Sequence, residues 1–283
     1  RIQNIPLILM AMLVMAMPLS CEKNQPDAGE SIITMDENLE PTPLDEWLEV
    51  NFVRPYNIDF KWRYDRKELD WNYVTIPADY LCIEVYRTTA GLPFTRKYFP
   101  KMFVLSGAWQ YLSNGTMILG TAEGGKKIML AGVNDLNKHV YSASRLNQYY
   151  LKTIHHEFTH ILNQTAPYPS GFKEISGPDY VADLWSTTTD WLSRGFITQY
   201  AQHSDVEDFA EMMSTYILTN AATWDQWLAQ AGDGAKKINA KMEIVRAYME
   251  EEFHLDMDIL RYEINWRQQM VENRKVDLLD LTI

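Results

Sequence analysis

The stretch that decides the fold covers residues 146–162 and reads LNQYYLKTIHHEFTHIL. Apolar side chains return at every fourth position: Leu146, Tyr150, Ile154, Phe158 and Leu162. This repeat predicts an amphipathic helix. At about 100° per residue, His156 and His160 then lie together, roughly opposite the apolar stripe. Two imidazoles one turn apart can share a tetrahedral zinc ion, and Glu157 beside the first can act as general base on a water.

A five-residue H-E-x-x-H match also arises by chance, so the remainder of a metal site has to be present elsewhere in the chain. Residues 204–211 offer a third ligand on a predicted helix. Glu207 and Glu211 lie one turn apart on one flank of it. We predict that Glu207 binds the zinc and that Glu211 accepts a hydrogen bond from a ligand histidine. The alternative is structural, because Ser204 and Glu207 also form a capping-box pattern.

The predicted core face of this second helix consists of Val206, Ala210, Met213 and Ile217. Two further histidines lie near the proposed ligands. His155 points about 100° away from His156 on the first helix, which favours a structural or exposed position. His203 precedes the second helix, and the sequence leaves its role open.

The fold class expected from the whole pattern is α+β, with a small mixed sheet, then the metal-binding helix, then a mostly helical C-terminal part. Residues 44–52 predict a short helix, and residues 57–64 alternate like a half-buried strand. Residues 79–90 predict a helix that Gly91 caps. Apolar runs at 102–105, 117–119 and 128–133 predict short strands with tight turns. After residue 142, loops are expected at 166–178 and around Gly195 and Gly232.

The composition excludes some classes of partner. The chain of 283 residues has 26 basic and 38 acidic residues, a formal net charge of −12, and no long basic run. Nucleic acid is therefore not an expected partner, and neither is electrostatic attraction to an anionic membrane. Contact with a membrane would depend on a lipid at the N-terminus.

The N-terminal residues differ from the rest of the chain. Residues 5–19 are almost purely apolar and carry no charge, but at about 1.5 Å per residue they are too short to span a membrane. We predict a signal peptide at 1–20, a lipid-modified Cys21 and a flexible tether over 21–42, followed by one catalytic domain over 43–283. Pro18 departs from the usual aliphatic residue of a lipidation motif. With Cys21 acylated, Cys82 is the remaining thiol and is expected to be a small buried side chain.

Longer stretches of the chain resemble a known family. The pieces that match are Pro55-Tyr56-Asn57-Ile58, Tyr98-Phe99-Pro100-Lys101, residues 120–128, the HEFTH segment and residues 195–211. Two histidines on one helix with a glutamate on a later one look like the gluzincin arrangement. More closely, the chain resembles the substrate import-associated zinc metallohydrolase lipoproteins of Bacteroidota.

That resemblance implies a zincin-like fold, bound Zn²⁺, and an outer-membrane lipoprotein on the periplasmic or cell-surface face. It also implies TonB-dependent importer components as partners. Tyr200 matches a tyrosine that similar glutamate zincins use to stabilise the oxyanion. A packed tyrosine with a locally satisfied hydroxyl is the equal alternative.

The combined reading is a zinc metallopeptidase in which zinc lies on His156, His160 and Glu207, and Glu157 is the general base. The substrate would be a peptide or protein, held by adding to an edge strand of the small sheet. The rival interpretation is a non-catalytic accessory lipoprotein of an importer with a structural or vestigial zinc site. The presence of Glu157 argues against the rival, because a structural site needs ligands but no base.

Overall fold

A computed structural model describes residues 43–61 and 75–275, apart from positions 114, 116, 124 and 125. The predicted signal peptide, Cys21 and the tether lie outside the described residues. None of the helices in the described part is both long and apolar enough to cross a membrane.

The main sheet has four strands in the order β1 (Asp59–Lys61), β2 (Met102–Leu105), β6 (Lys127–Leu130) and β5 (Gly120–Glu123). The first three are parallel and β5 runs antiparallel at the edge, so the sheet is mixed, as expected. Phe60, Phe103 and Ile128 are in register across it and are buried, and the two phenylalanine rings stack 5.1 Å apart. Strands β3 (Gln110–Tyr111) and β4 (Met117–Ile118) form a separate antiparallel pair.

Helical segments precede and connect the strands. They are α2 (Pro43–Leu48), the π-helical turn η1 (Glu49–Val53), α3 (Arg54–Tyr56), α4 (Thr75–Tyr98) and the 3-10 segment η2 (Val133–Lys138). Helix α4 is interrupted at Gly91, whose φ of 87° lies in the left-handed region that glycine tolerates. The helix resumes with Pro93 in its first turn, where proline costs no hydrogen bond.

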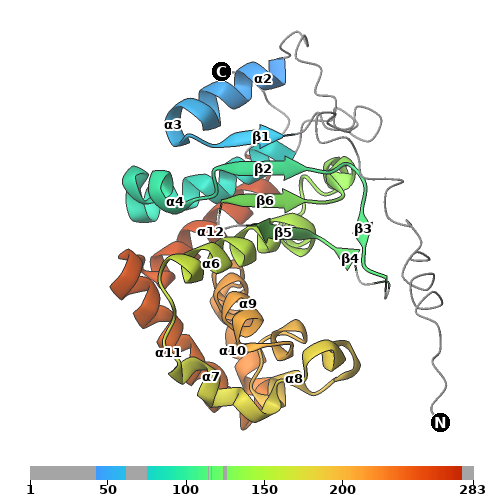
Figure 1. Cartoon of the computed structure of the whole chain (residues 1–283), viewed down its shortest axis with the longest axis vertical. Coiled ribbons are helices and arrows are strands. Elements are labelled where there is room, and N and C mark those ends of the chain that lie inside the picture. The colour runs from blue at the N-terminus through green and yellow to red at the C-terminus, as the bar shows by residue number, and fades with distance from the viewer. Residues whose placement is uncertain (1–42, 62–74, 114, 116, 124–125, 276–283) are drawn as a thin grey trace, which may run out of the picture. The chain divides into compact units, whose positions relative to one another are not determined.

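The second half of the described chain is mostly helical (Figure 1). It contains α5 (Ala143–Leu146), the π-helical turn η3 (Asn147–Leu151), α6 (Lys152–Thr165), α7 (Gly171–Ser176), η4 (Gly177–Asp179), η5 (Ala182–Thr187), α8 (Trp191–Arg194), η6 (Tyr200–Gln202), α9 (Asp205–Leu218), α10 (Ala221–Ala231), α11 (Gly234–Phe253) and α12 (Met257–Glu272). Together with the small sheet, this confirms the predicted α+β class.

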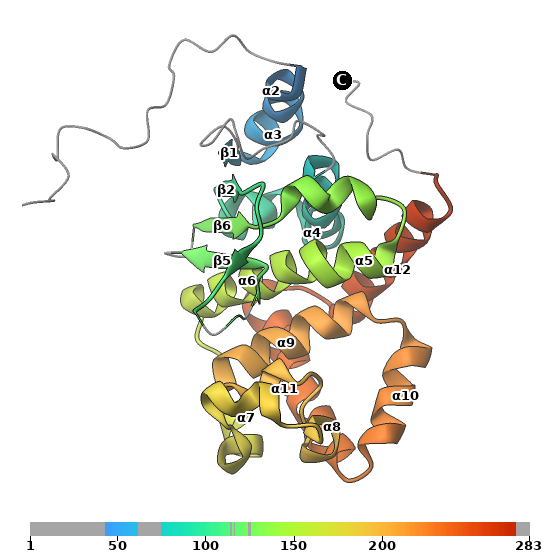
Figure 2. The same ribbon diagram turned by 90° about the vertical axis from the view of Figure 1, so that its right-hand side faces the viewer.

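Helix α6 lies between the sheet and α9 in both ribbon views (Figures 1 and 2). Its contact with β5 is close at Gly120, where a Cβ atom would be 2.6 Å from Thr153 Cγ2 and 2.5 Å from the backbone oxygen of Met129. Glycine is needed at this place because any larger residue would push the edge strand away from α6.

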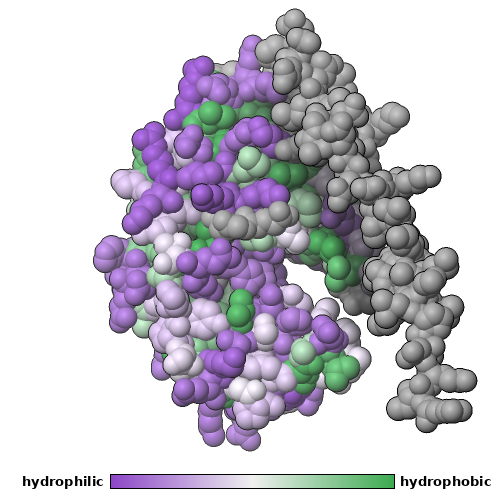
Figure 3. Space-filling model, viewed as in Figure 1, coloured by the Kyte–Doolittle hydropathy of each residue, from purple (hydrophilic) through white to green (hydrophobic). Residues whose placement is uncertain are grey.

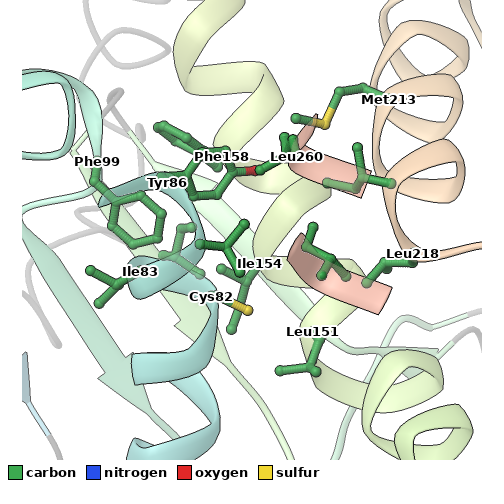
Figure 4. Packing of buried hydrophobic residues seen from close by; sticks show 14 of the residues in the cluster. Cys82, Ile83, Tyr86, Phe99, Leu151, Ile154, Phe158, Met213, Leu218 and Leu260 are labelled. Atoms are coloured by element: carbon green, nitrogen blue, oxygen red, sulfur yellow. The ribbon is translucent and has the colours of Figure 1, made fainter. Parts of the chain in front are cut away.

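The opposite face of α6 packs into the core. Phe158 is fully buried, and its ring meets those of Tyr86 at 4.8 Å and Phe99 at 4.7 Å. Figure 4 shows that Ile154 and Phe158 from α6 meet side chains of α4, α9 and α12. One face of α6 is therefore fixed by packing, which leaves the other face for polar residues.

Several predicted boundaries need correction. The strand predicted over 57–64 begins at Asp59, because Asn57 adopts the left-handed conformation that ends α3; residues from 62 onward lie outside the described part. The predicted strand 128–133 ends at Leu130, since Gly132 turns the chain into η2. The strand predicted at 117–119 is β4, and the edge strand β5 that follows it was not foreseen.

Two helical features also differ from expectation. The loop predicted over 166–178 contains α7, in which Phe172 and Ser176 are buried. Val206, predicted on the core face of α9, is 44% exposed, while Ala210, Met213 and Ile217 are fully buried. Val206 lies in the first turn of α9, where residues 205–207 are exposed or half-buried, whereas residues 208–218 are all buried. The helix ends at Gly195 and Gly232 agree with the prediction.

Candidate metal centre

Helices α6 and α9 bring three donor groups together at one point. His156 Nε2 lies 2.9 Å from Glu207 Oε2 and 3.1 Å from His160 Nε2, and His160 Nε2 lies 3.4 Å from the same carboxylate oxygen. All three donor atoms lie within 4.8 Å of one another. Two imidazole nitrogens and one carboxylate oxygen are a donor set that zinc takes in hydrolytic sites, with one position left open. The three residues therefore fit a zinc ion.

Glu207 combines its position at the start of α9 with its contacts to the histidines. Ser204 caps the helix, and its Oγ accepts a hydrogen bond from the Glu207 backbone N–H at 3.3 Å. The Glu207 side chain extends instead to His156 and His160. The capping interaction and the approach to the histidines thus coexist, because they use different atoms of Glu207.

Glu211 lies one turn further along α9 and is buried. Its Oε1 is 2.9 Å from Nδ1 of His156, the ring nitrogen that faces away from Glu207. Its Oε2 accepts hydrogen bonds from Lys152 Nζ at 2.6 Å and from Thr198 Oγ1 at 2.5 Å. Our sequence reasoning did not identify Lys152 or Thr198. Lys152 could have been found, because it precedes His156 by one helical turn, whereas nothing in the sequence marked Thr198.

The two carboxylates set the charge state of His156. Burial alone would lower the pKa of this histidine, but hydrogen bonds to Glu207 and Glu211 outweigh burial and raise the pKa to about 9. For Glu207, burial is likewise outweighed, and the hydrogen bonds with His156 and His160 hold its pKa well below the usual range. Burial would also raise the pKa of Glu211, but the charge of Lys152 and the hydrogen bond to His156 hold it well below its usual value. Both carboxylates are therefore anionic at neutral pH.

Tyr200 lies beside this group in η6. Its ring centre is 6.1 Å from that of His156, and Trp185 meets its edge at 5.1 Å. Burial, and then the charges of Glu207 and Glu211, raise the pKa of Tyr200 above its ordinary value. Its phenol thus stays protonated and is able to donate a hydrogen bond.

Glu157 follows His156 on α6 and is partly exposed. It contributes to the raised pKa values of both His156 and Tyr200, in each case as a smaller influence than burial and the other two glutamates. The structure thus brings His156, His160 and Glu207 together, with Tyr200 and Glu211 beside His156 and with Glu157 next to it on α6.

The other two histidines have different surroundings. His155 is 1% exposed, and its Nδ1 lies 2.9 Å from the Tyr86 hydroxyl and its Nε2 3.7 Å from Cys82 Sγ. Of the two expectations for His155, the structural one holds. Cys82 is a buried side chain, as predicted. His203 stacks on Tyr200 at 5.7 Å and its Nε2 lies 3.7 Å from Asp183, so it is not part of the donor group.

Known proteins that are similar to this chain are described as zinc-binding. No curated protein matches the chain. A solved structure that is similar to it is the crystal structure of a putative zinc-binding metallo-peptidase from Bacteroides caccae, with 33% sequence identity and a TM-score of 0.71. The match covers 85% of this chain and 96% of that one. Residues 37–258, which include both α6 and α9, match the model of the family described as putative zinc-binding metallo-peptidase. The chain therefore belongs to the putative zinc-binding metallo-peptidase family.

Proposed function

We propose that this protein is a zinc-dependent peptidase whose metal is held by His156, His160 and Glu207. The observation that carries the proposal is the convergence of these three donor atoms within 4.8 Å, with Glu157 next to the first ligand. Zinc in such a site acts as a Lewis acid and lowers the pKa of a coordinated water toward neutrality. Membership of a zinc-binding metallo-peptidase family supports the same metal.

Three side chains of the protein have distinct chemical roles in this proposal. Glu157 accepts a proton from the attacking water and returns it to the leaving amine. Tyr200 donates a hydrogen bond to the substrate carbonyl oxygen as negative charge develops there. Glu211 accepts the Nδ1–H of His156, which directs Nε2 of that ring toward the metal.

The edge strand β5 supports an extended peptide as the substrate. It is the last strand of the sheet and packs against α6, so its outer edge runs beside the helix that carries the histidines. A peptide can add to such an edge through main-chain hydrogen bonds. Figure 3 shows a hollow between the part that carries β4 and the part that carries α8, with hydrophobic surface on both rims.

We also propose that the protein is an outer-membrane lipoprotein that works beside TonB-dependent import components. The support comes from the sequence: an uncharged apolar segment that ends in Ser20-Cys21, followed by a polar stretch. Cys21→Ser should abolish labelling by a fatty-acid analogue and release the protein from membranes. An unlabelled parent protein with unchanged membrane partition would refute the lipid anchor.

The experiment that tests the peptidase is Glu157→Gln, compared by a proteome-derived peptide cleavage profile and by zinc content. Glutamine keeps the shape of the side chain but accepts no proton, so cleavage should be lost while zinc stays bound. Glu250→Gln is the matched control, because Glu250 is an exposed glutamate on α11. If wild type and Glu157→Gln both hold zinc and neither cleaves any peptide, the accessory-protein reading replaces this one.

A further inference from the structure

The buried carboxylate of Glu211 is held by three side chains from two separate parts of the chain. His156 and Lys152 approach it from α6, and Thr198 approaches it from the segment before η6. The Glu211 side chain is 5% exposed and that of Lys152 is 31% exposed. Each Oε atom has its own partners, since Oε1 faces His156 while Oε2 accepts from Lys152 and Thr198.

Two carboxylates therefore compete for one imidazole from opposite sides. Glu207 Oε2 lies 2.9 Å from Nε2 of His156, and Glu211 Oε1 lies 2.9 Å from Nδ1 of the same ring. Their surroundings differ. Within the described part of the chain, Glu207 forms its ion pairs with the two histidines, whereas Glu211 also pairs with a lysine.

The lysine has a physical purpose at this position. A buried carboxylate without a cation or hydrogen-bond donors is unstable, and it gains by moving toward any nearby cation, including a metal. Lys152 supplies a cationic donor, and Thr198 fills a second acceptor direction on the same oxygen. With Oε2 occupied in this way, Glu211 retains Oε1 for the Nδ1–H of His156.

Helix geometry explains why Lys152 meets the carboxylate that holds His156. Lys152 precedes His156 by four residues, so the two side chains lie on one face of α6. Glu207 and Glu211 are likewise four residues apart on α9. Lys152 and His156, nearer the start of α6, therefore lie opposite the deeper carboxylate of α9. Glu207 lies by the other nitrogen of His156 and by His160.

We propose that Lys152 and Thr198 are positioning residues that fix Glu211 as the hydrogen-bond acceptor of His156 and reserve Glu207 for the metal. This proposal rests on the proposed function, since it assumes that His156, His160 and Glu207 bind zinc. Lys152 determines the roles of two otherwise similar glutamates. Neither Lys152 nor Thr198 is one of the three donor residues.

The test measures metal binding in the full chain. Zn²⁺ affinity is determined by competition with a coloured chelator, and Co²⁺ is used as a second probe because its visible spectrum reports coordination geometry. Lys152→Met and Thr198→Val should each weaken Zn²⁺ binding. In Lys152→Met the Zn²⁺ affinity should fall by about 10 to 100-fold, as it does when other groups that orient a metal ligand are lost. Both variants should also change the Co²⁺ spectrum, which a loss of stability alone would not do.

Lys152→Arg should restore affinity and spectrum most of the way, since it keeps the charge and the donors. Lys138→Met is the matched control, because Lys138 is an exposed lysine that pairs with Asp135 on η2. Thermal unfolding of each variant shows whether it folds. If Lys152→Met does not fold, Thr198→Val and Lys152→Arg still decide the outcome.

The results distinguish failure of the positioning role from failure of the proposed zinc site. The positioning role alone would be overturned if Lys152→Met kept wild-type Zn²⁺ affinity and an unchanged Co²⁺ spectrum. If Lys152→Met does not fold, the same result in Thr198→Val would overturn it. An arginine variant as weak as the methionine variant would overturn the role of the charge. If His156→Ala binds Zn²⁺ as well as wild type does, the metal site itself is misplaced, and the proposed function fails first.

Discussion

The ion pair between Lys241 and Asp208 should be one of the most sensitive points for stability. Both side chains are 0% exposed, and their charged atoms are 2.5 Å apart. Lys241 also donates to the Gly195 carbonyl at 2.9 Å, and Tyr180 donates to Asp208 Oδ2 at 2.9 Å. The pair thus ties α9, immediately after Glu207, to α11 and to the end of α8.

Lys241→Met removes the cation and leaves Asp208 buried without one. Loss of one partner of a buried pair costs about 3–5 kcal/mol, because the remaining charge is uncompensated. For a domain of this size that loss corresponds to a fall in Tm of roughly 6–20 °C. Burial already raises the pKa of Asp208 to about 6 and lowers that of Lys241, so desolvation opposes both charges.

The same helix offers a matched control. Lys236 pairs with Asp233 at 3.6 Å, but the two side chains are 86% and 101% exposed. Lys236→Met should therefore change the free energy of unfolding by less than about 1 kcal/mol. The double variant Asp208→Asn, Lys241→Met should recover most of the loss, because it removes both charges and leaves Tyr180 an acceptor.

Urea unfolding followed by tryptophan fluorescence and circular dichroism measures these free energies in a double-mutant cycle. If Lys241→Met lowered the free energy of unfolding by less than about 1 kcal/mol, the reasoning would be refuted, because a buried aspartate left without its cation should destabilise the fold by more than that. A double variant less stable than Lys241→Met would contradict the predicted recovery, because Asp208 would then stabilise the fold even without its lysine.

Three further predictions follow from other contacts. In equilibrium dialysis, Glu207→Ala should abolish zinc binding, whereas Glu211→Ala should lower the zinc affinity by about 10 to 100-fold. If Glu211→Ala abolished binding and Glu207→Ala only weakened it, the roles of the two glutamates would be exchanged. Burial lowers the pKa of His155 to about 3. Below about pH 6.5, therefore, the unfolded state binds a proton that the folded state does not. The free energy of unfolding of the wild type should fall by about 1.4 kcal/mol for each pH unit by which the pH is lowered. Urea unfolding of His155→Gln between pH 4 and 6 should lack this component, and parallel curves for the two proteins would contradict it. Gly120→Ala should lower the free energy of unfolding by about 1–3 kcal/mol, because the added Cβ would lie 2.6 Å from Thr153 Cγ2. If the variant had the urea midpoint of the wild type, β5 and α6 would be less closely packed than described.

Local periodicity was sufficient to predict where α6 and α9 lie and which of their faces carry His156, His160 and Glu207. The phase of a helix follows from its own sequence, so residues four apart are placed correctly without tertiary information. The same reasoning placed Val206 in the core incorrectly, because exposure in the first turn of α9 depends on how far neighbouring helices extend.

The surroundings of Glu211 were only partly predictable. Its link to His156 follows from the two helix patterns, but the contact with Thr198 joins a non-helical segment to α9 and depends on the chain path before η6. The Lys241 and Asp208 pair was not predictable either, since periodicity places an aspartate at α9 and a lysine at α11 without showing that they meet. Contacts distant in sequence need the packed structure.

The π-helical turn η3 has a consequence for insertions and deletions near the metal site. Such a turn closes its hydrogen bonds over five residues, one more than an α-helical turn. Five residues of a π-helical turn rotate the chain by roughly the same angle as four residues of an α-helix. Deletion of the exposed Gln148 would therefore allow a regular α-helix with little change in the phase of α5 relative to His156, and the buried side chains of Ala143 and Leu146 would still face the core. Insertion of one residue into α6 before His156 would instead rotate α5 by about 100° relative to His156, so the π-helical turn can lose a residue more readily than α6 can gain one.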